Sequence, residues 1–295
     1  MNKILVPVDF SITSANALRL ACAIAAHYNA AVHLLHVADS DEDLGKPDVH
    51  ERSHDFAGST KKLREFGRAV AAAYKINCIC ATEYGSVTHI ILKKAKQLHP
   101  DLIIMGKNGS NGPSGLFAGT HTCQVAKKSD TPVLIVPGQT VRPAFNQVLL
   151  PLRPLTSMTG KYYRMRPFIV KDKAFITILS LHNPVPQNEF HATHALTELI
   201  KNKLQLDGLA YTIEHYKDEE QFAETVLMES GNPEKKYDLT IIIADYRPTQ
   251  EPFRFSVEEQ VIIHHTKTPL LLLHGSETFV QDGTWIQFMT RNREA

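Results

Sequence analysis

The chain has 295 residues, and a single hydrophobic core rarely grows beyond roughly 250–300 residues, so we expect two domains. Hydrophobic residues make up 43% of the chain and charged residues 21%, which excludes the disordered, collagenous and low-complexity classes. The 32 basic and 31 acidic residues give a formal net charge of +1, so no excess charge favours nucleic acid or an anionic membrane as a partner.

Cysteine spacing and hydropathy indicate the cellular compartment in which the protein is expected. The four cysteines form no Cys-x-x-Cys motif, and the first residues lead into a strand-like segment rather than a secretory signal. Apolar runs such as 241–244 and 270–273 are far shorter than the roughly 20 residues that span a bilayer. We therefore expect a cytoplasmic protein with reduced cysteines and no membrane span.

Five short apolar runs rich in Val, Ile and Leu occur in the first half of the chain and are typical of buried strands. They are residues 4–8, 31–37, 76–81, 101–105 and 132–136. Segments with helical spacing separate them, including one of roughly 58–74, whereas the acidic stretch 38–57 predicts a solvated loop. This alternation predicts a mainly parallel sheet covered on both faces by helices, and such a sheet binds ligands at the carboxyl ends of its strands.

The same pattern begins again in the second half of the chain. Residues 101–104 return as 238–241 and residues 131–136 return as 268–273, both 137 positions later (238 − 101 and 268 − 131). One offset over two separate matches predicts a duplicated fold. The expected parts are a first domain at 1–140, a second domain at 146–275 and a C-terminal tail at 276–295.

A glycine-rich segment follows the fourth predicted strand. It reads Met105-Gly106-Lys107-Asn108-Gly109, then nine residues, then Gly119-Thr120 at the start of a helix expected over 119–129. Glycines let the backbone approach a ligand, and a helix that begins at such a loop directs its free N–H groups and positive dipole end toward an anion. The segment predicts a phosphate site, although its spacing fits neither a P-loop nor a Gly-x-Gly-x-x-Gly dinucleotide loop.

Together with residues 3–9 (KILVPVD) and 129–137 (SDTPVLIVP), this glycine motif resembles the universal stress protein family in its tandem, two-domain form. The resemblance covers the first 140 residues well, whereas the second half shares only the general pattern of strand-like segments. It implies an α/β fold of two similar Rossmann-like domains of the adenine nucleotide alpha hydrolase type. Each domain would have a five-stranded, mainly parallel sheet with helices on both faces.

The resemblance also implies a stress-response or regulatory protein that binds ATP or AMP, with or without Mg²⁺, in its first domain. The ends of the first two strands would meet the base and ribose, the end of the fourth strand would lie at the ribose, and the glycine motif would hold the phosphates. In that order, the residues are Pro7, Val8, Asp9 and Val37, then Met105 and Gly106, then Gly109, Gly119 and Thr120, with weaker phosphate-side roles for Lys107 and His121.

The second domain departs from the family where the nucleotide would bind. Arg153 stands at the position that matches Asp9, and no glycine occurs in the stretch that follows 238–244. We therefore expect no nucleotide in this domain. In dimeric relatives the last strand of each domain pairs with its partner, so the resemblance predicts that 132–136 and 269–273 pair and make the chain an intramolecular pseudo-dimer.

Two alternative functions stay open. One is a nucleotide-free scaffold that binds another protein, and the other is a slow, Mg²⁺-dependent ATPase. Beyond Asp9 and Thr120 the motif supplies no evident base or second metal ligand, so we assign no catalytic residue and expect at most slow hydrolysis. A homodimer of the tandem chain and an unidentified protein partner also stay open.

Two weaker clusters favour ordinary structure over a site. His191, His194 and Glu198 share one helical face, but no further ligand is evident, so we expect no metal site. Basic and aromatic residues alternate over 161–166 as in a nucleic-acid surface, yet the nearly neutral chain favours a solvated helix start there.

Overall fold

The computed structural model describes residues 1–39, 49–107, 121–138, 142–152, 159–181, 187–216, 222–243 and 257–273. The first half contributes β1 (Lys3–Pro7), α1 (Ile12–Tyr28), β2 (Ala31–Asp39), α2 (Val49–Tyr74), β3 (Cys78–Gly85), α3 (Val87–Leu98), β4 (Leu102–Gly106), α4 (His121–Lys128) and β5 (Val133–Val136). The second half contributes β6 (Gln147–Leu152), α5 (Thr159–Ile169), β7 (Phe175–Leu181), α6 (Gln187–Leu206), β8 (Tyr211–Tyr216), α7 (Phe222–Ser230), β9 (Leu239–Ile243), α8 (Val257–His265) and β10 (Leu270–Leu273).

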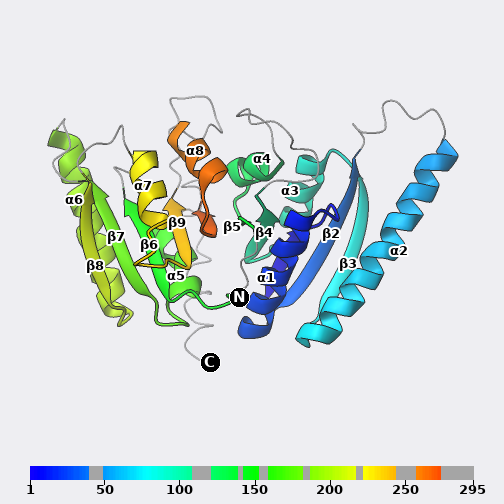
Figure 1. The fold of residues 1–295 in the computed structure, drawn as a ribbon, viewed down its shortest axis with the longest axis horizontal. Coiled ribbons are helices and arrows are strands. Elements are labelled where there is room, and N and C mark those ends of the chain that lie inside the picture. Colours follow the sequence, from blue (N-terminus) through cyan, green and yellow to red (C-terminus); the bar gives the residue numbers. More distant parts are fainter. Residues whose placement is uncertain are drawn as a thin grey trace, which may run out of the picture.

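The strands of the described residues form one continuous sheet in the order β3-β2-β1-β4-β5-β10-β9-β6-β7-β8 (Figure 1). Within each half all neighbouring strands are parallel, and the two halves have the same strand order. The halves meet where β5 and β10 pair antiparallel, with Leu134 opposite Leu271. The predicted fold class of two similar five-stranded α/β domains is therefore confirmed.

Helices cover both faces of the sheet because the strand residues alternate between two apolar cores. In β1, Ile4 and Val6 belong to the core that also contains residues of α1, α2, α5 and α6, whereas Leu5 belongs to the core beneath α3, α4, α7 and α8. Side chains of successive strand residues point to opposite faces, so a run without polar residues is buried on both sides. This explains why the central strands are continuously apolar.

The duplication extends to individual hydrogen bonds. Asp101 Oδ2 accepts from the N–H groups of Asn2 and Lys3, at 2.6 and 3.0 Å, and Asp238 Oδ2 accepts from Asn146 and the following residue, both at 3.1 Å. In each half an aspartate that precedes the fourth strand thus anchors the beginning of the first strand. The same chemistry at equivalent positions supports a repeated unit rather than a coincidence of sequence.

Side chains from both halves meet beyond the β5–β10 pair. His27 Nε2 at the end of α1 lies 2.6 Å from Asp172 Oδ1, and the Asp172 side chain is only 6% exposed. The Tyr28 hydroxyl donates to the carbonyl of Pro167 in α5 (2.9 Å). The halves therefore join through a strand pair and through polar contacts between the ends of their first helices.

Two local expectations from the sequence differ from the structure. The helix expected over about 58–74 begins at Val49, because no glycine or proline interrupts the chain between 49 and 57 and a high charge content does not prevent a helix. The solvated start expected at 161–166 is wrong, since Lys161 and Tyr162 are only 8% and 1% exposed. The Tyr162 hydroxyl donates to Asp207 Oδ2 (2.7 Å), which satisfies its polar atom inside the protein.

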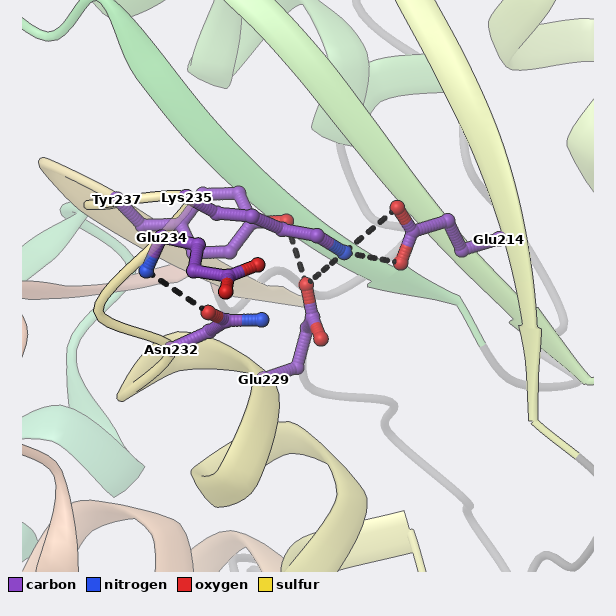
Figure 2. A network of polar contacts seen from close by, with 6 residues as sticks. All are labelled: Glu214, Glu229, Asn232, Glu234, Lys235 and Tyr237. Atoms are coloured by element: carbon purple, nitrogen blue, oxygen red, sulfur yellow. Dashed lines mark hydrogen bonds and ion pairs between the residues drawn. The ribbon is translucent and has the colours of Figure 1, made fainter.

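A polar network holds three elements of the second half together (Figure 2). Lys235 Nζ donates to both carboxylate oxygens of Glu214 on β8, at 2.7 and 2.6 Å, and to Glu229 Oε1 on α7 at 2.6 Å. The buried Tyr237 donates its hydroxyl to the same Glu229 oxygen (2.7 Å). The network connects the edge strand to the helix and to the segment that leads into β9.

No helix in the described part of the chain is long and apolar enough to cross a membrane.

Candidate functional site

The order of strands places a switch point between β1 and β4. From β1 the chain moves outward through β2 to β3, and from β4 it moves the other way to β5, so the loops after β1 and β4 leave in different directions. In open α/β sheets such a point creates a crevice at the carboxyl ends of the strands, where ligands bind. Asp9 follows β1, Val37 lies near the end of β2, and Gly106 ends β4, so these predicted residues lie at one edge of the sheet.

Asp9 is half-buried and oriented by the turn that begins α1. Its Oδ1 accepts from the Ser11 N–H (3.0 Å) and from the Ser11 hydroxyl (2.6 Å). Ser11 is at the same time the N-cap of α1, because its Oγ accepts from the Ser14 N–H at 3.2 Å. The helix cap is thus supplied by Ser11, and the Asp9 carboxylate is held in a fixed orientation at the carboxyl end of β1.

Gly106 lies against the first turn of α1. A Cβ added at this glycine would be 2.8 Å from the carbonyl carbon and from the carbonyl oxygen of Thr13. The Thr13 hydroxyl is in turn 2.9 Å from Ser11 Oγ, the atom that contacts Asp9. The end of β4 and the Asp9 carboxylate are therefore connected through one helical turn, and only glycine permits this close approach.

The start of α4 is attached to its surroundings by two side chains. His121 Nδ1 lies 3.1 Å from the Thr88 hydroxyl in the first turn of α3, and Thr122 Oγ1 donates to the carbonyl of Gly106 (2.9 Å). These contacts bring the first residues of α4 to the end of β4, as a site shared between them requires. The remaining predicted residues of the motif, Gly109, Gly119 and Thr120, lie outside the described residues.

Lys107 reaches toward the second half of the chain. Its N–H donates to Val136 O on β5 (3.0 Å), and its ammonium donates to the carbonyl of Thr266, directly after α8 (3.2 Å). Burial, followed by the nearby charge of Lys267, lowers the pKa of Lys107. The lysine that was assigned a weak phosphate-side role therefore also belongs to the junction between the halves.

An aromatic stack beside Asp9 is not evident from the sequence. Phe10 has a left-handed backbone (φ 61°), and its ring lies 4.6 Å from the His36 ring, with Lys62 Nζ 4.3 Å from the Phe10 centroid. His36 Nδ1 also lies 2.8 Å from the carbonyl of Val8. A positive φ at a bulky residue is uncommon, and such residues are concentrated at functional sites. No sequence motif predicts this backbone conformation at Phe10.

The second half has a bulky residue at the position that matches Gly106. Ile243 stands at the equivalent position, 137 residues later, and the β9–β10 register matches that of β4–β5. Ile243 is buried in the apolar core, so the second half carries a β-branched side chain at a position where any side chain on Gly106 would collide with Thr13 of α1. The departures predicted at Arg153 and in the stretch after β9 lie outside the described residues.

Elsewhere in the described structure, the candidates for a metal site or a ligand pocket are weaker than the edge at Asp9 and Gly106. Among the described residues no group of three or more His, Cys, Asp or Glu side chains is placed to hold a metal ion. A hollow of about 440 Å³ lies at the opposite, amino edge of the sheet and is lined by Asn2, Asn29, Asn77 and Lys75, all exposed. Its open polar lining points to a surface depression rather than to a built site.

The chain is similar to known proteins both in sequence and in structure. The model of the universal stress protein family matches residues 1–137. Universal stress protein MJ0577 of Methanocaldococcus jannaschii is 30% identical over 154 residues, which cover 45% of this chain and 93% of that protein. Universal stress protein YxiE of Bacillus subtilis is 28% identical over 145 residues, or 46% of this chain and 98% of that protein.

A structural match extends over both halves. The crystal structure of a universal stress protein from Archaeoglobus fulgidus superposes with a TM-score of 0.71 and 16% sequence identity, and covers 94% of this chain and 97% of that one. At this identity the match shows the fold of the two halves together. With the sequence match to MJ0577 along nearly its whole length, we conclude that the chain belongs to the universal stress protein family.

Proposed function

We propose that this protein is a stress-response protein that binds one adenine nucleotide, ATP or AMP, in its first half. The support for the proposal is the arrangement at the switch point, where Asp9, Val37 and Gly106 occupy the carboxyl ends of three neighbouring strands. The glycine motif begins at this same edge, and Gly106 tolerates no side chain there. The chain also belongs to the universal stress protein family, and its resemblance to that family implies an adenine nucleotide in the first domain.

The second half would act as a built-in pairing partner rather than as a second nucleotide site. Two sequence differences support this role: the bulky Ile243 stands in place of Gly106, and the positively charged Arg153 stands in place of the Asp9 carboxylate. The antiparallel β5–β10 pair gives each half a partner for its last strand. The cytoplasmic location and a role for Mg²⁺ stay predictions.

The direct test is to release and identify small molecules from protein purified without added nucleotide, and then to titrate ATP, ADP and AMP into the emptied protein. We expect saturation at about one nucleotide per chain, since one half carries the motif. Two per chain would contradict the assignment of the second half. No released nucleotide and no binding would favour the nucleotide-free scaffold.

A carboxylate variant tests the position of the site. Asp9→Ala should weaken adenine nucleotide binding by about tenfold, because a carboxylate that hydrogen-bonds a buried polar ligand contributes on the order of 1.5 kcal/mol. Glu65→Ala removes an exposed acid from α2 and serves as the control, with unchanged affinity expected. Equal affinity in both variants would exclude Asp9 from the site.

A further inference from the structure

The junction between the halves passes beside the candidate nucleotide site. Lys107 stands in the motif between Gly106, which is assigned to the ribose, and Gly109, which is assigned to the phosphates. Its N–H bond to Val136 O fixes its main chain next to β5, the strand that pairs with β10 of the second half. Its side chain then crosses to the second half and donates to Thr266 O (3.2 Å).

The turn whose Thr266 carbonyl accepts from Lys107 is held in place by the hydroxyl groups of two threonines. Thr266 is buried, and its hydroxyl donates to the carbonyl of Thr268 (2.7 Å). The Thr268 hydroxyl donates to Ser230 O at the end of α7 (2.8 Å). These bonds fix the main chain of the turn, so the exposed Lys267 lies between two fixed threonines and directly after the carbonyl that accepts from Lys107.

Positive charges from both halves gather around this contact. Burial and the charge of Lys267 lower the pKa of Lys107, and burial, His265, Lys107 and Lys127 lower the pKa of His264. Burial is the largest cause of both shifts, and nearby positive charge shifts each pKa in the same direction. Within the described residues neither Lys107 nor Lys267 forms an ion pair, so an anion placed between them would relieve their repulsion.

The contact is not repeated on the other side of the pseudo-twofold. The residue 137 positions after Lys107 is Ala244, which has no charge with which to reach back toward the first half. The junction therefore brings lysines together beside the first half's motif, where a nucleotide is expected, and the sequence provides no such lysine at the equivalent place in the second half.

We propose that the second half completes the nucleotide site by supplying Lys267, which together with Lys107 binds the outer phosphates and makes the site select a nucleoside triphosphate over a monophosphate. This inference rests on the proposed function and decides between the two nucleotides that the sequence leaves open. An ammonium group has three donors, so Lys107 can keep its bond to Thr266 while it contacts a phosphate. Bound triphosphate would then also strengthen the junction between the halves.

The experiment is a calorimetric titration of the full chain with ATP, with AMP and with inorganic tripolyphosphate, at low and at high salt. The unchanged protein should prefer ATP to AMP, and the preference should shrink as salt screens the lysines. Lys267→Ala should weaken ATP binding by about fivefold, the upper range for an exposed charge pair, and should leave AMP binding unchanged. Lys107→Gln should weaken ATP binding by more than Lys267→Ala does. Lys107→Arg should keep the preference for ATP over AMP, because the positive charge remains.

Lys96→Ala is the matched control, since it removes an exposed lysine on α3 outside the junction and should change neither affinity. Thermal unfolding of each variant establishes that it is folded. The inference is overturned, while the proposed function stands, if the unchanged protein binds ATP and AMP with equal affinity. The same holds if Lys267→Ala weakens the binding of ATP and of AMP by the same factor. If no adenine nucleotide binds but tripolyphosphate does and is weakened by Lys267→Ala, the proposed function fails and the lysine pair remains a polyphosphate site.

Discussion

At the scale of single residues, Gly106 carries the strictest steric requirement described at the candidate site. A methyl group there would lie 2.8 Å from the main chain of Thr13, and a main-chain neighbour cannot rotate away as a flexible side chain can. We expect Gly106→Ala to lower the free energy of unfolding by about 1–3 kcal/mol, the usual effect of overpacking, and to displace the start of α1. Urea unfolding measures the first effect, and loss of nucleotide binding would report the second.

Gly58 provides the control for this substitution. It lies within α2, and an added Cβ would meet nothing within 4 Å. Gly58→Ala should therefore raise the free energy of unfolding by about 0.5–1 kcal/mol, because alanine favours the helix. If Gly106→Ala were as well tolerated as Gly58→Ala, the close approach of α1 to β4 would not be a requirement of the fold.

Residue identities in the candidate site can be predicted from the sequence, but the orientations of the side chains cannot. The family motif points to Asp9 and Gly106, whereas it does not specify the local hydrogen bonds through which Ser11 orients the Asp9 carboxylate. The left-handed Phe10 is a further example, because its conformation opposes the local preference of a bulky residue and is held by packing against His36. Long-range contacts of this kind follow from the fold and not from the local sequence.

At the scale of elements, the Lys235 network ties the edge strand β8 to α7 and the segment before β9 (Figure 2). Although burial alone would lower its pKa, the hydrogen bonds to Glu214 and Glu229 raise the pKa of Lys235, so it is charged at neutral pH. Lys235→Met would leave two carboxylates facing each other without a cation. We expect a loss of about 1–2 kcal/mol in the free energy of unfolding, reduced from the buried case because the network is partly exposed.

The comparison variant is Lys201→Met, which removes the lysine of a single, partly exposed i, i+3 ion pair with Glu198 on α6. It should leave the urea midpoint unchanged, since a single ion pair between neighbouring turns of a helix contributes little. Equal effects of the two substitutions would mean that the network around Lys235 is no more than a surface ion pair. Tyr237→Phe offers an independent check, because it removes one donor to Glu229 and keeps the lysine.

The strands were predicted more accurately than the helix boundaries. Each expected strand of the first half lies within a few residues of its observed position, because a buried parallel strand needs an uninterrupted apolar run. The start of α2 at Val49 was missed, since its charged first turns carry no apolar periodicity that would separate them from a loop. The buried start of α5 is not predicted for the converse reason, because Tyr162 looks solvated in the sequence and only the fold brings Asp207 beside its hydroxyl.

At the scale of the whole molecule, the sequence repeat at an offset of 137 residues predicts most of the architecture. Two copies of one unit predict two copies of one sheet, and equivalent hydrogen bonds at Asp101 and Asp238 follow from the same repeat. The repeat alone does not predict which contacts are unequal. Lys107 bonds across the junction while Ala244 cannot, and this asymmetry is visible only once the two halves are side by side.

The β5–β10 pair leads to a prediction for the first half alone. The family model matches residues 1–137, and relatives that cover 45–46% of this chain are matched over 93–98% of their own length, so we expect one unit to fold without a second domain. In a fragment of residues 1–140, the strand Val133–Val136 would lose its partner and expose an apolar edge with unpaired backbone groups. Such edges associate with another strand, and a symmetric dimer satisfies both copies at once.

We therefore expect the fragment 1–140 to form a homodimer in which two copies of β5 pair antiparallel, as β5 and β10 do in the full chain. Light scattering after size-exclusion chromatography should give twice the fragment's mass, and dilution should produce monomer because the interface is now bimolecular. Leu134, at the centre of the pair, faces Leu271 in the chain and would face its own copy in the dimer. A folded fragment that stays monomeric at all concentrations would mean that contacts such as His27 with Asp172, rather than the strand edges, hold the halves together.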